Sequence, residues 1–139
     1  MSPAKQTTIR RLGPGDDEVV RKLAEGEPHT ALLSDEATIF LAAFDGAEPV
    51  GFVFGYELPR RHGHPSILFV YELDVNEAFR RQGIATRLMT ELAQIARSRG
   101  IREGFVLTEL DNDAANALYR SLDGERVDSV MWDFAYTDG

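Results

Sequence analysis

Residues 71–86 read YELDVNEAFRRQGIAT, and this stretch constrains the fold more than any other part of the chain. The apolar run at residues 67–71 leads into it and is typical of a strand buried on both faces. After a polar loop, a helix is expected over residues 82–99, because apolar side chains recur there at spacings of four, four and three. These side chains are Ile84, Leu88, Leu92 and Ile95. Strand, loop and helix in this order indicate an α/β unit.

The beginning of this helix has the features of a phosphate site. A helix N-terminus presents unpaired N–H groups and a partial positive charge. Gly83 and Ala85 lack bulk and would let a pyrophosphate approach the backbone, while Arg80 and Arg81 add charge. The lysine-containing triphosphate loop and the Gly-x-Gly-x-x-Gly fingerprint are both missing from this stretch. The residues alone leave two interpretations open: a phosphate site, or two solvated arginines before an ordinary helix.

The rest of the chain alternates between strand and helix patterns. A strand is expected at residues 6–12, with Asp16 as the N-cap of a helix to about residue 25, and a short helix or a loop at residues 26–36. Asp45-Gly46 between two apolar runs predicts a hairpin. The remaining predictions are strands at 38–44, 49–58 and 66–75, a buried strand at 104–108, a strand or bent strand pair at 127–136, and a helix from 111 or 112 to 122. A meander followed by strand, helix and strand favours an α/β (α+β) fold with a mixed sheet.

Length and composition exclude several classes of protein. At 139 residues with 43% hydrophobic residues, the chain is expected to form one domain over residues 1–139. It has no cysteine, which excludes disulfides, thiolate metal sites and a cysteine nucleophile. Residues 1–6 lack the pattern of a secretory signal, and the apolar runs are too short to span a membrane, so a cytoplasmic protein is expected.

Charge is distributed unevenly along the chain. The net charge is −8, which disfavours nucleic acid and anionic membranes and favours a cationic partner. Residues 61–100 carry six basic and four acidic groups, whereas residues 101–139 carry three and nine. A positive segment between acidic flanks predicts that an anion and a cation bind at one site.

Two motifs together carry a family resemblance. Residues 80–85, RRQGIA, resemble the Arg/Gln-x-x-Gly-x-Gly/Ala signature of the GNAT N-acetyltransferases, and residues 112–119, NDAANALY, resemble the family's Asn-x-x-Ala-x-x-Leu-Tyr. The motifs lie 32 residues apart in the expected order, so the chain is identified as a member of this family. The resemblance implies the GNAT fold, with a mixed central sheet of six to seven strands and about four helices. It also implies acetyl-CoA as co-substrate, a primary amine as acceptor, and a homodimer.

A narrower resemblance concerns the acceptor. Residues 42–45, 71–75, 80–86, 117–119 and 130–134 look like those of aminoglycoside 3-N-acetyltransferases, which implies a role in antibiotic resistance. The stretch that precedes residue 38 is shorter than in those enzymes. Acetylation of another amine (a polyamine, an amino acid or a protein N-terminus) therefore stays open. A module that binds CoA without turnover is the third alternative.

The resemblance also implies roles for individual residues. Glu72 would be the general base, the Leu73 N–H would stabilise the oxyanion, and Tyr119 would be the general acid. The residues implied in cofactor binding are Leu73, Val75, Arg80, Arg81, Gln82, Gly83, Ile84, Ala85, Thr86, Asn112 and Tyr119. Those implied in acceptor binding are Tyr71, Glu72, Glu109, Asp111 and Asp133. No metal site is expected, because His62 and His64 alone supply too few ligands.

Overall fold

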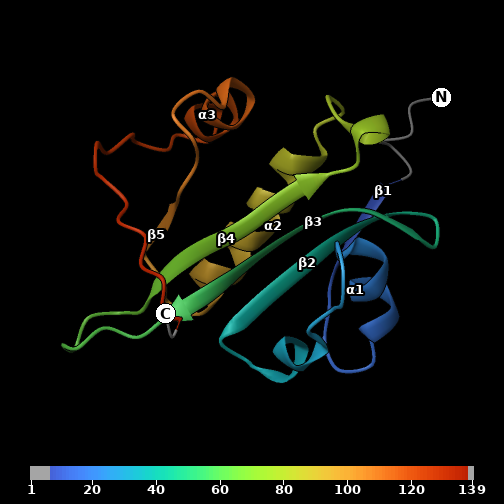
Figure 1. Ribbon diagram of the computed structural model, residues 1–139, viewed down its shortest axis with the longest axis horizontal. Coiled ribbons are helices and arrows are strands. Elements are labelled where there is room, and N and C mark those ends of the chain that lie inside the picture. Colours follow the sequence, from blue (N-terminus) through green and yellow to red (C-terminus); the bar gives the residue numbers. More distant parts are fainter. Residues whose placement is uncertain (1–6, 138–139) are drawn as a thin grey trace. The chain divides into compact units, whose positions relative to one another are not determined.

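The computed structural model describes residues 7–137 and contains two compact units, one ending at Leu107 and the other beginning at Thr108 (Figure 1). The first unit contains β1 (Thr7–Arg11), α1 (Asp17–Leu23), the 3-10 helix η2 (Thr30–Ser34), β2 (Thr38–Asp45), β3 (Glu48–Leu58), β4 (Ile67–Val75), the 3-10 helix η3 (Glu77–Phe79), α2 (Ile84–Ser98) and β5 (Glu103–Val106). The second unit contains α3 (Asp113–Ser121). None of the helices described is both long and apolar enough to cross a membrane.

The five strands form one mixed sheet in the order β1-β2-β3-β4-β5. The first four are antiparallel neighbours, and β5 pairs in parallel with β4 after the crossover through α2. The hairpin at Asp45-Gly46 is confirmed, and Gly46 adopts a φ of 63°, which glycine tolerates without strain. The meander and the strand–helix–strand unit are therefore as the sequence predicted.

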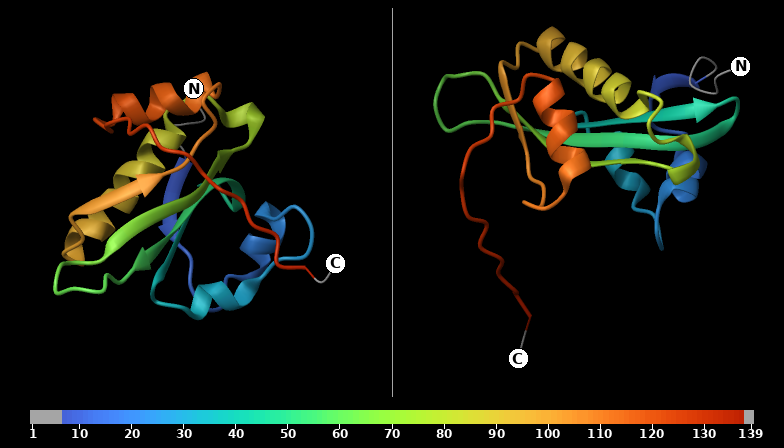
Figure 2. Two further views of the ribbon diagram at one scale, coloured as in Figure 1. Left: turned by 60° about the vertical axis from the view of Figure 1, so that its left-hand side comes forward. Right: turned by 90° about the horizontal axis from the view of Figure 1, so that it is seen from above.

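Helix α2 covers one face of the sheet, as Figure 2 shows. The predicted apolar stripe is buried at Ile84, Leu88 and Leu92, and Ala96 completes it while Ile95 is half-buried. These side chains pack against the face of the sheet that carries Ile39, Val53 and Val70, among others. Because an α-helix turns once every 3.6 residues, these spacings place the apolar side chains on one side of α2, the side that packs against the sheet.

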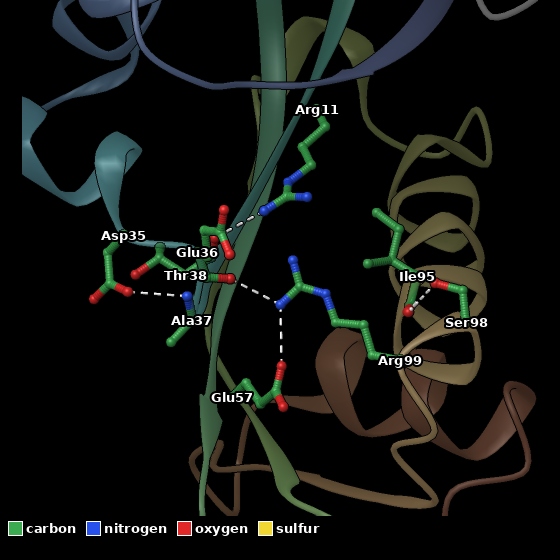
Figure 3. A network of polar contacts seen from close by, with 9 residues as sticks. All are labelled: Arg11, Asp35, Glu36, Ala37, Thr38, Glu57, Ile95, Ser98 and Arg99. Carbon is green, nitrogen blue, oxygen red and sulfur yellow. Dashed lines mark hydrogen bonds and ion pairs between the residues drawn. The ribbon is translucent and has the colours of Figure 1, made fainter.

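The C-terminal end of α2 is fastened to the strands by Arg99 (Figure 3). The Arg99 guanidinium donates to the Glu36 carbonyl oxygen at 2.8 Å and pairs with the Glu57 carboxylate at 3.0 Å. A cation at the C-terminal end of a helix is also favoured by the helix dipole. This contact fixes α2 relative to β2 and β3.

The opposite face of the sheet is covered in part by α1 and η2 (Figure 2). Val20 of α1 and Leu33 of η2 pack with Phe40, Phe44 and Phe54 from the strands. The open alternative at residues 26–36 is thus resolved as a short 3-10 helix. Asp16 stands at the N-cap of α1 as predicted, but its carboxylate accepts from the Gly13 N–H instead of capping the helix.

Several sequence predictions were wrong. The described chain has five strands and three α-helices, not six to seven strands and about four helices. Residues 127–136 form no strand, and their apolar side chains are exposed, although the alternation fits a strand. Neither β4 nor β5 is buried throughout, because β5 is an edge strand and Tyr71 of β4 is 54% exposed. Residue 6, the predicted first residue of β1, lies outside the described residues, and the single-domain organisation stays a prediction.

Candidate active site

An irregularity in β4 positions the candidate general base. A regular strand alternates its faces, yet Tyr71 and Glu72 are consecutive exposed residues in β4. Four side chains of β4 pack under α2: two precede this break at even-numbered positions, and two follow it at odd-numbered positions. They are Leu68, Val70, Leu73 and Val75. The strand therefore contains one extra residue at this point.

The pairing with β3 locates the extra residue. Phe54 pairs with Glu72, whereas the next residue, Gly55, pairs with Val70, so Tyr71 has no partner in the ladder. This is a β-bulge, which sends two successive side chains to one face. The Tyr71 ring lies 5.5 Å from the Phe54 ring, on the face away from α2. Glu72 is opposite Phe54 and shares this face, where it is exposed and forms no ion pair with the described residues.

Beyond the bulge, one edge of β4 is open. Strand β5 pairs only with residues Ile67–Val70, so the rest of β4 has no neighbour on that side within the sheet. The Asn76 N–H donates to the Val50 carbonyl oxygen at 2.8 Å, and backbone groups alternate along an antiparallel ladder. The N–H groups of Leu73 and Val75 therefore point away from β3, towards the open edge, where the Val75 N–H donates to Asp74 Oδ1 at 2.9 Å. The structure brings this edge and the Glu72 carboxylate to neighbouring positions.

Arg80 fastens the following loop to the end of β4. Its Nε donates to the Val75 carbonyl oxygen at 2.8 Å, and its Nη2 lies 3.4 Å from Asp74 Oδ1. Part of its charge is therefore engaged within the chain. Arg81 is exposed and forms no ion pair with any described residue, so its charge is available to a bound anion.

The N-terminus of α2 lacks a side-chain cap. Gly83 is the N-cap with a φ of 81°, and Arg81 also has a positive φ of 62°. The first helical hydrogen bond runs from the Arg87 N–H to the Gly83 carbonyl, so the preceding N–H groups lack an intrahelical acceptor. These N–H groups belong to Ile84, Ala85 and Thr86. Such a set of donors fits a diphosphate. The Gln82 amide is next to it in the chain: its Nε2 donates to the Ala78 carbonyl oxygen at 3.5 Å, and its buried Oε1, an acceptor, has no partner among the described residues.

The second unit carries the other predicted site residues. The Asn112 side chain caps α3 by accepting from the Ala115 N–H at 3.1 Å. Tyr119 is half-buried on α3, and burial raises the pKa of its phenol above 10.0. Three predicted acceptor carboxylates are exposed within this unit: Glu109, Asp111 and Asp133.

Three residues that bear on this site were missed by the sequence analysis. Gly55 stands opposite the bulge, Tyr56 lies beside Tyr71 with ring centroids 5.7 Å apart, and Asp35 ends η2. Burial raises the pKa of Tyr56, and the charges of Tyr71, Glu72 and Asp35 raise it further. The alternation of aromatic residues at 52, 54 and 56 was the signal that could have identified Tyr56. Among the described residues, no group of three or more histidine or carboxylate side chains could hold a metal ion.

Known proteins share this sequence pattern and this fold. Residues 9–123 match the sequence profile of the Acetyltransferase (GNAT) family. The L-2,4-diaminobutyric acid acetyltransferase of Methylotuvimicrobium alcaliphilum is 35% identical over 97 residues, which are 67% of this chain and 55% of that protein. The N-alpha-acetyltransferase RimI of Mycobacterium tuberculosis is 40% identical over 86 residues, 59% of this chain and 51% of that protein. The chain thus spans about half the length of these two curated relatives.

A solved structure matches over nearly the whole chain. The aminoglycoside acetyltransferase HMB0005, from an uncultured soil metagenomic sample, is 28% identical with a TM-score of 0.82. The match covers 94% of this chain and 99% of that one.

Proposed function

Because the chain belongs to the GNAT family of acetyltransferases, we propose that it transfers an acetyl group from acetyl-CoA to a primary amine. The observation that carries the proposal is the bulge at Tyr71. This bulge places the Glu72 carboxylate beside an open strand edge, and the uncapped N-terminus of α2 follows eleven residues later. One unit thus offers a proton acceptor, donors for an oxyanion and a diphosphate site.

The residues of the chain fit acetyl-CoA at two places. The N–H groups of residues 84–86 and the Arg81 guanidinium would bind the diphosphate. The open edge at Leu73 would pair with the amide groups of the pantetheine arm, in the manner of an added strand, and Val75 would join this pairing by releasing its contacts with Asp74 and Arg80. Acetyl-CoA supplies the thioester, and the chain holds it along this edge.

The transfer requires proton movements that these side chains can carry. An acceptor amine arrives as an ammonium ion, which has no lone pair, so Glu72 would bind it while one proton passes to water. The neutral amine then attacks the thioester carbonyl, and Glu72 would take the second N–H proton as the C–N bond forms. The Leu73 N–H would stabilise the oxyanion. The new C–N bond forms, the C–S bond breaks, and Tyr119 would give its proton to the leaving thiolate.

The pKa values limit how each group acts. A carboxylate is a much weaker base than an amine, so Glu72 would take the proton only as the C–N bond forms. Tyrosine at about 10 is roughly 1.5 units above a thiol, a cost of about 2 kcal/mol. Burial raises the pKa of Tyr119 and enlarges this cost, but it also keeps the phenol protonated at neutral pH.

The finer proposal for the acceptor is the 3-amino group of an aminoglycoside. Local sequence similarity around residues 71–75 and 130–134 supports it, and so does the net charge of −8, which attracts a polycation. A 28% identical protein of the same fold is named an aminoglycoside acetyltransferase. The alternative acceptors are an amino acid such as diaminobutyrate and a protein N-terminus, after the names of the two curated relatives.

The test follows CoA release from acetyl-CoA with a thiol reagent, with and without gentamicin. We expect gentamicin-dependent release that falls at least about 100-fold in Glu72→Gln, the usual loss for a general base. Glu91→Gln removes an exposed carboxylate on α2 and serves as the matched control. Release with diaminobutyrate or a peptide instead of gentamicin would reassign the acceptor. Full release by Glu72→Gln would contradict the assigned base, and CoA binding without turnover of any amine would indicate a binding module.

A further inference from the structure

A row of aromatic rings runs across the sheet on the face that carries Glu72. It begins in the core, where the rings of Phe40 and Phe54 lie 5.1 Å apart. It continues through Phe54 and Tyr56 at 5.7 Å, and through Tyr56 and Tyr71 at 5.7 Å. The row then reaches the edge strand, because Tyr71 contacts Phe69 at 5.6 Å, which stacks on Phe105 at 4.6 Å.

Only the first part of this row serves the hydrophobic core. Phe40 and Phe54 are about 5–6% exposed and belong to the cluster under α1 and η2, with Tyr56 packed against it. Tyr71 is 54% exposed and Phe105 is 40% exposed, and neither belongs to a core cluster. Exposed aromatic side chains that continue a packed row form a surface suited to a ligand.

Two carboxylates lie within electrostatic reach of the Tyr56 phenol. Glu72 follows Tyr71 in β4, and Asp35 ends η2, three residues before Thr38, the residue that pairs with Tyr56 in the sheet. Both carboxylates raise the pKa of Tyr56, in addition to the effect of burial and of Tyr71, so the potential at this phenol is negative.

No cation of the described chain neutralises Asp35. Its carboxylate accepts one hydrogen bond, from the Ala37 N–H at 2.9 Å, and it forms no ion pair within residues 7–137. Figure 3 shows Arg99 and Glu57 on the side of the strands that faces α2, with Asp35 on the other side. An ammonium group at this place would meet a carboxylate and the faces of tyrosine rings, both of which attract cations.

We propose that Asp35, Tyr56 and Tyr71 bind a second ammonium group of the acceptor while Glu72 binds the one to be acetylated. This inference rests on the proposed function and narrows its substrate class to diamines and polyamines. A monoamine can occupy only the Glu72 position and leaves Asp35 without a counter-ion. The acceptor is therefore selected by two charges at a fixed separation.

Calorimetry on the full chain loaded with CoA tests the site without turnover. The probes are 1,4-diaminobutane and 1-aminobutane, with gentamicin as a larger polyamine. We expect the diamine to bind at least about tenfold more tightly than the monoamine, the ratio that corresponds to 1.4 kcal/mol. Asp35→Asn keeps an oxygen for the Ala37 N–H and removes only the charge. It should abolish this preference and leave binding of the monoamine within twofold.

Three further variants separate this role from a structural one. Tyr56→Leu removes the ring and should weaken diamine binding, whereas Tyr56→Phe should restore it. Glu36→Gln removes the neighbouring exposed carboxylate and should change the affinity for neither the diamine nor the monoamine. In turnover with any active diamine, Asp35→Asn should raise KM and leave kcat within twofold. Equal binding of the diamine and the monoamine, or an unchanged preference in Asp35→Asn, would overturn the proposal. Absence of turnover with every amine, despite selective binding, would instead reject the proposed function.

Discussion

Gly55 is the residue on which the geometry of the bulge depends most, so we expect Gly55→Ala to disturb both stability and activity. A Cβ atom at Gly55 would lie 2.7 Å from the Phe69 carbonyl oxygen and 3.3 Å from Val70 Cα. Both atoms belong to the backbone of β4, so no side-chain rotation relieves the contact. The two strands would have to separate by about 0.5 Å to restore an ordinary contact. That displacement occurs next to Tyr71 and Glu72.

The magnitudes follow from two opposing effects. Overpacking costs about 1–3 kcal/mol, and alanine in place of a strand glycine returns about 0.5–1 kcal/mol. The middle of each range gives a net loss of about 1.3 kcal/mol, which lowers Tm by about 4–5 °C for a chain of this size. A 1 Å misplacement of reacting groups can cost about 100-fold in rate, so half that displacement should lower kcat about tenfold.

The assay combines thermal unfolding, followed by circular dichroism, with CoA release well below Tm. Gly63→Ala is the matched control, because nothing lies within 4 Å of its Cβ position and its φ is not positive. Gly51→Ala provides an intermediate case in the same strand, with the Asp74 carbonyl oxygen 3.1 Å away. A Tm within 1 °C of the unmodified chain, on the order of the error, would refute the steric argument. A lower Tm with unchanged kcat would show that the bulge does not set the catalytic geometry.

Three further predictions concern charge and protons. Tyr119→Phe should lower kcat about 100-fold. Burial raises the pKa of the Tyr119 phenol, which donates only while protonated, so the unmodified chain should lose rate above pH 10 and Tyr119→Phe should not. A pH–rate profile of both proteins checks this. Burial acts to raise the pKa of Asp16, but the Gly13 N–H and Arg10 lower it overall, so its ionised form stabilises the fold above 3.8 and this contribution is lost as pH falls through the lower folded pKa. Asp16→Asn should therefore lower the free energy of unfolding by about 1 kcal/mol at pH 7. This loss should become smaller as the pH falls from 3.8 through the folded pKa, and urea unfolding at several pH values measures it. Arg81→Ala should raise KM for acetyl-CoA about tenfold at low salt, less at high salt, and leave kcat unchanged in steady-state kinetics.

Local signals were enough to predict much of the secondary structure. The Asp45-Gly46 turn, the stripe of α2 and the Asn112 cap each depend on residues within a few positions of one another. The strand predicted at residues 127–136 was wrong because alternation describes only a side-chain pattern, and a strand also needs a hydrogen-bonded neighbour that no local signal reveals.

The residues of the candidate site also fall into those that local sequence reveals and those that it does not. Glu72 and the glycine at the start of α2 stand in one continuous stretch, so the sequence could single them out. Tyr56 contacts Tyr71, the neighbour of Glu72, only because β3 pairs with β4, and Asp35 comes within electrostatic reach of Tyr56 because β2 pairs with β3. Such pairing joins residues that are far apart in the chain. The need for glycine at position 55 depends on a carbonyl oxygen of another strand, which the sequence does not show.

The bulge is the point at which the fold and the candidate site depend on the same residue. Without the extra residue in β4, the alternation set by Leu68 and Val70 would direct Glu72 towards the core under α2. Burial of an unpaired carboxylate costs several kcal/mol, and Leu73 would at the same time lose its place in that core. The sequence avoids both costs by shifting phase at Tyr71. The packing of α2 therefore requires the irregularity that exposes Glu72, and it does so independently of any substrate.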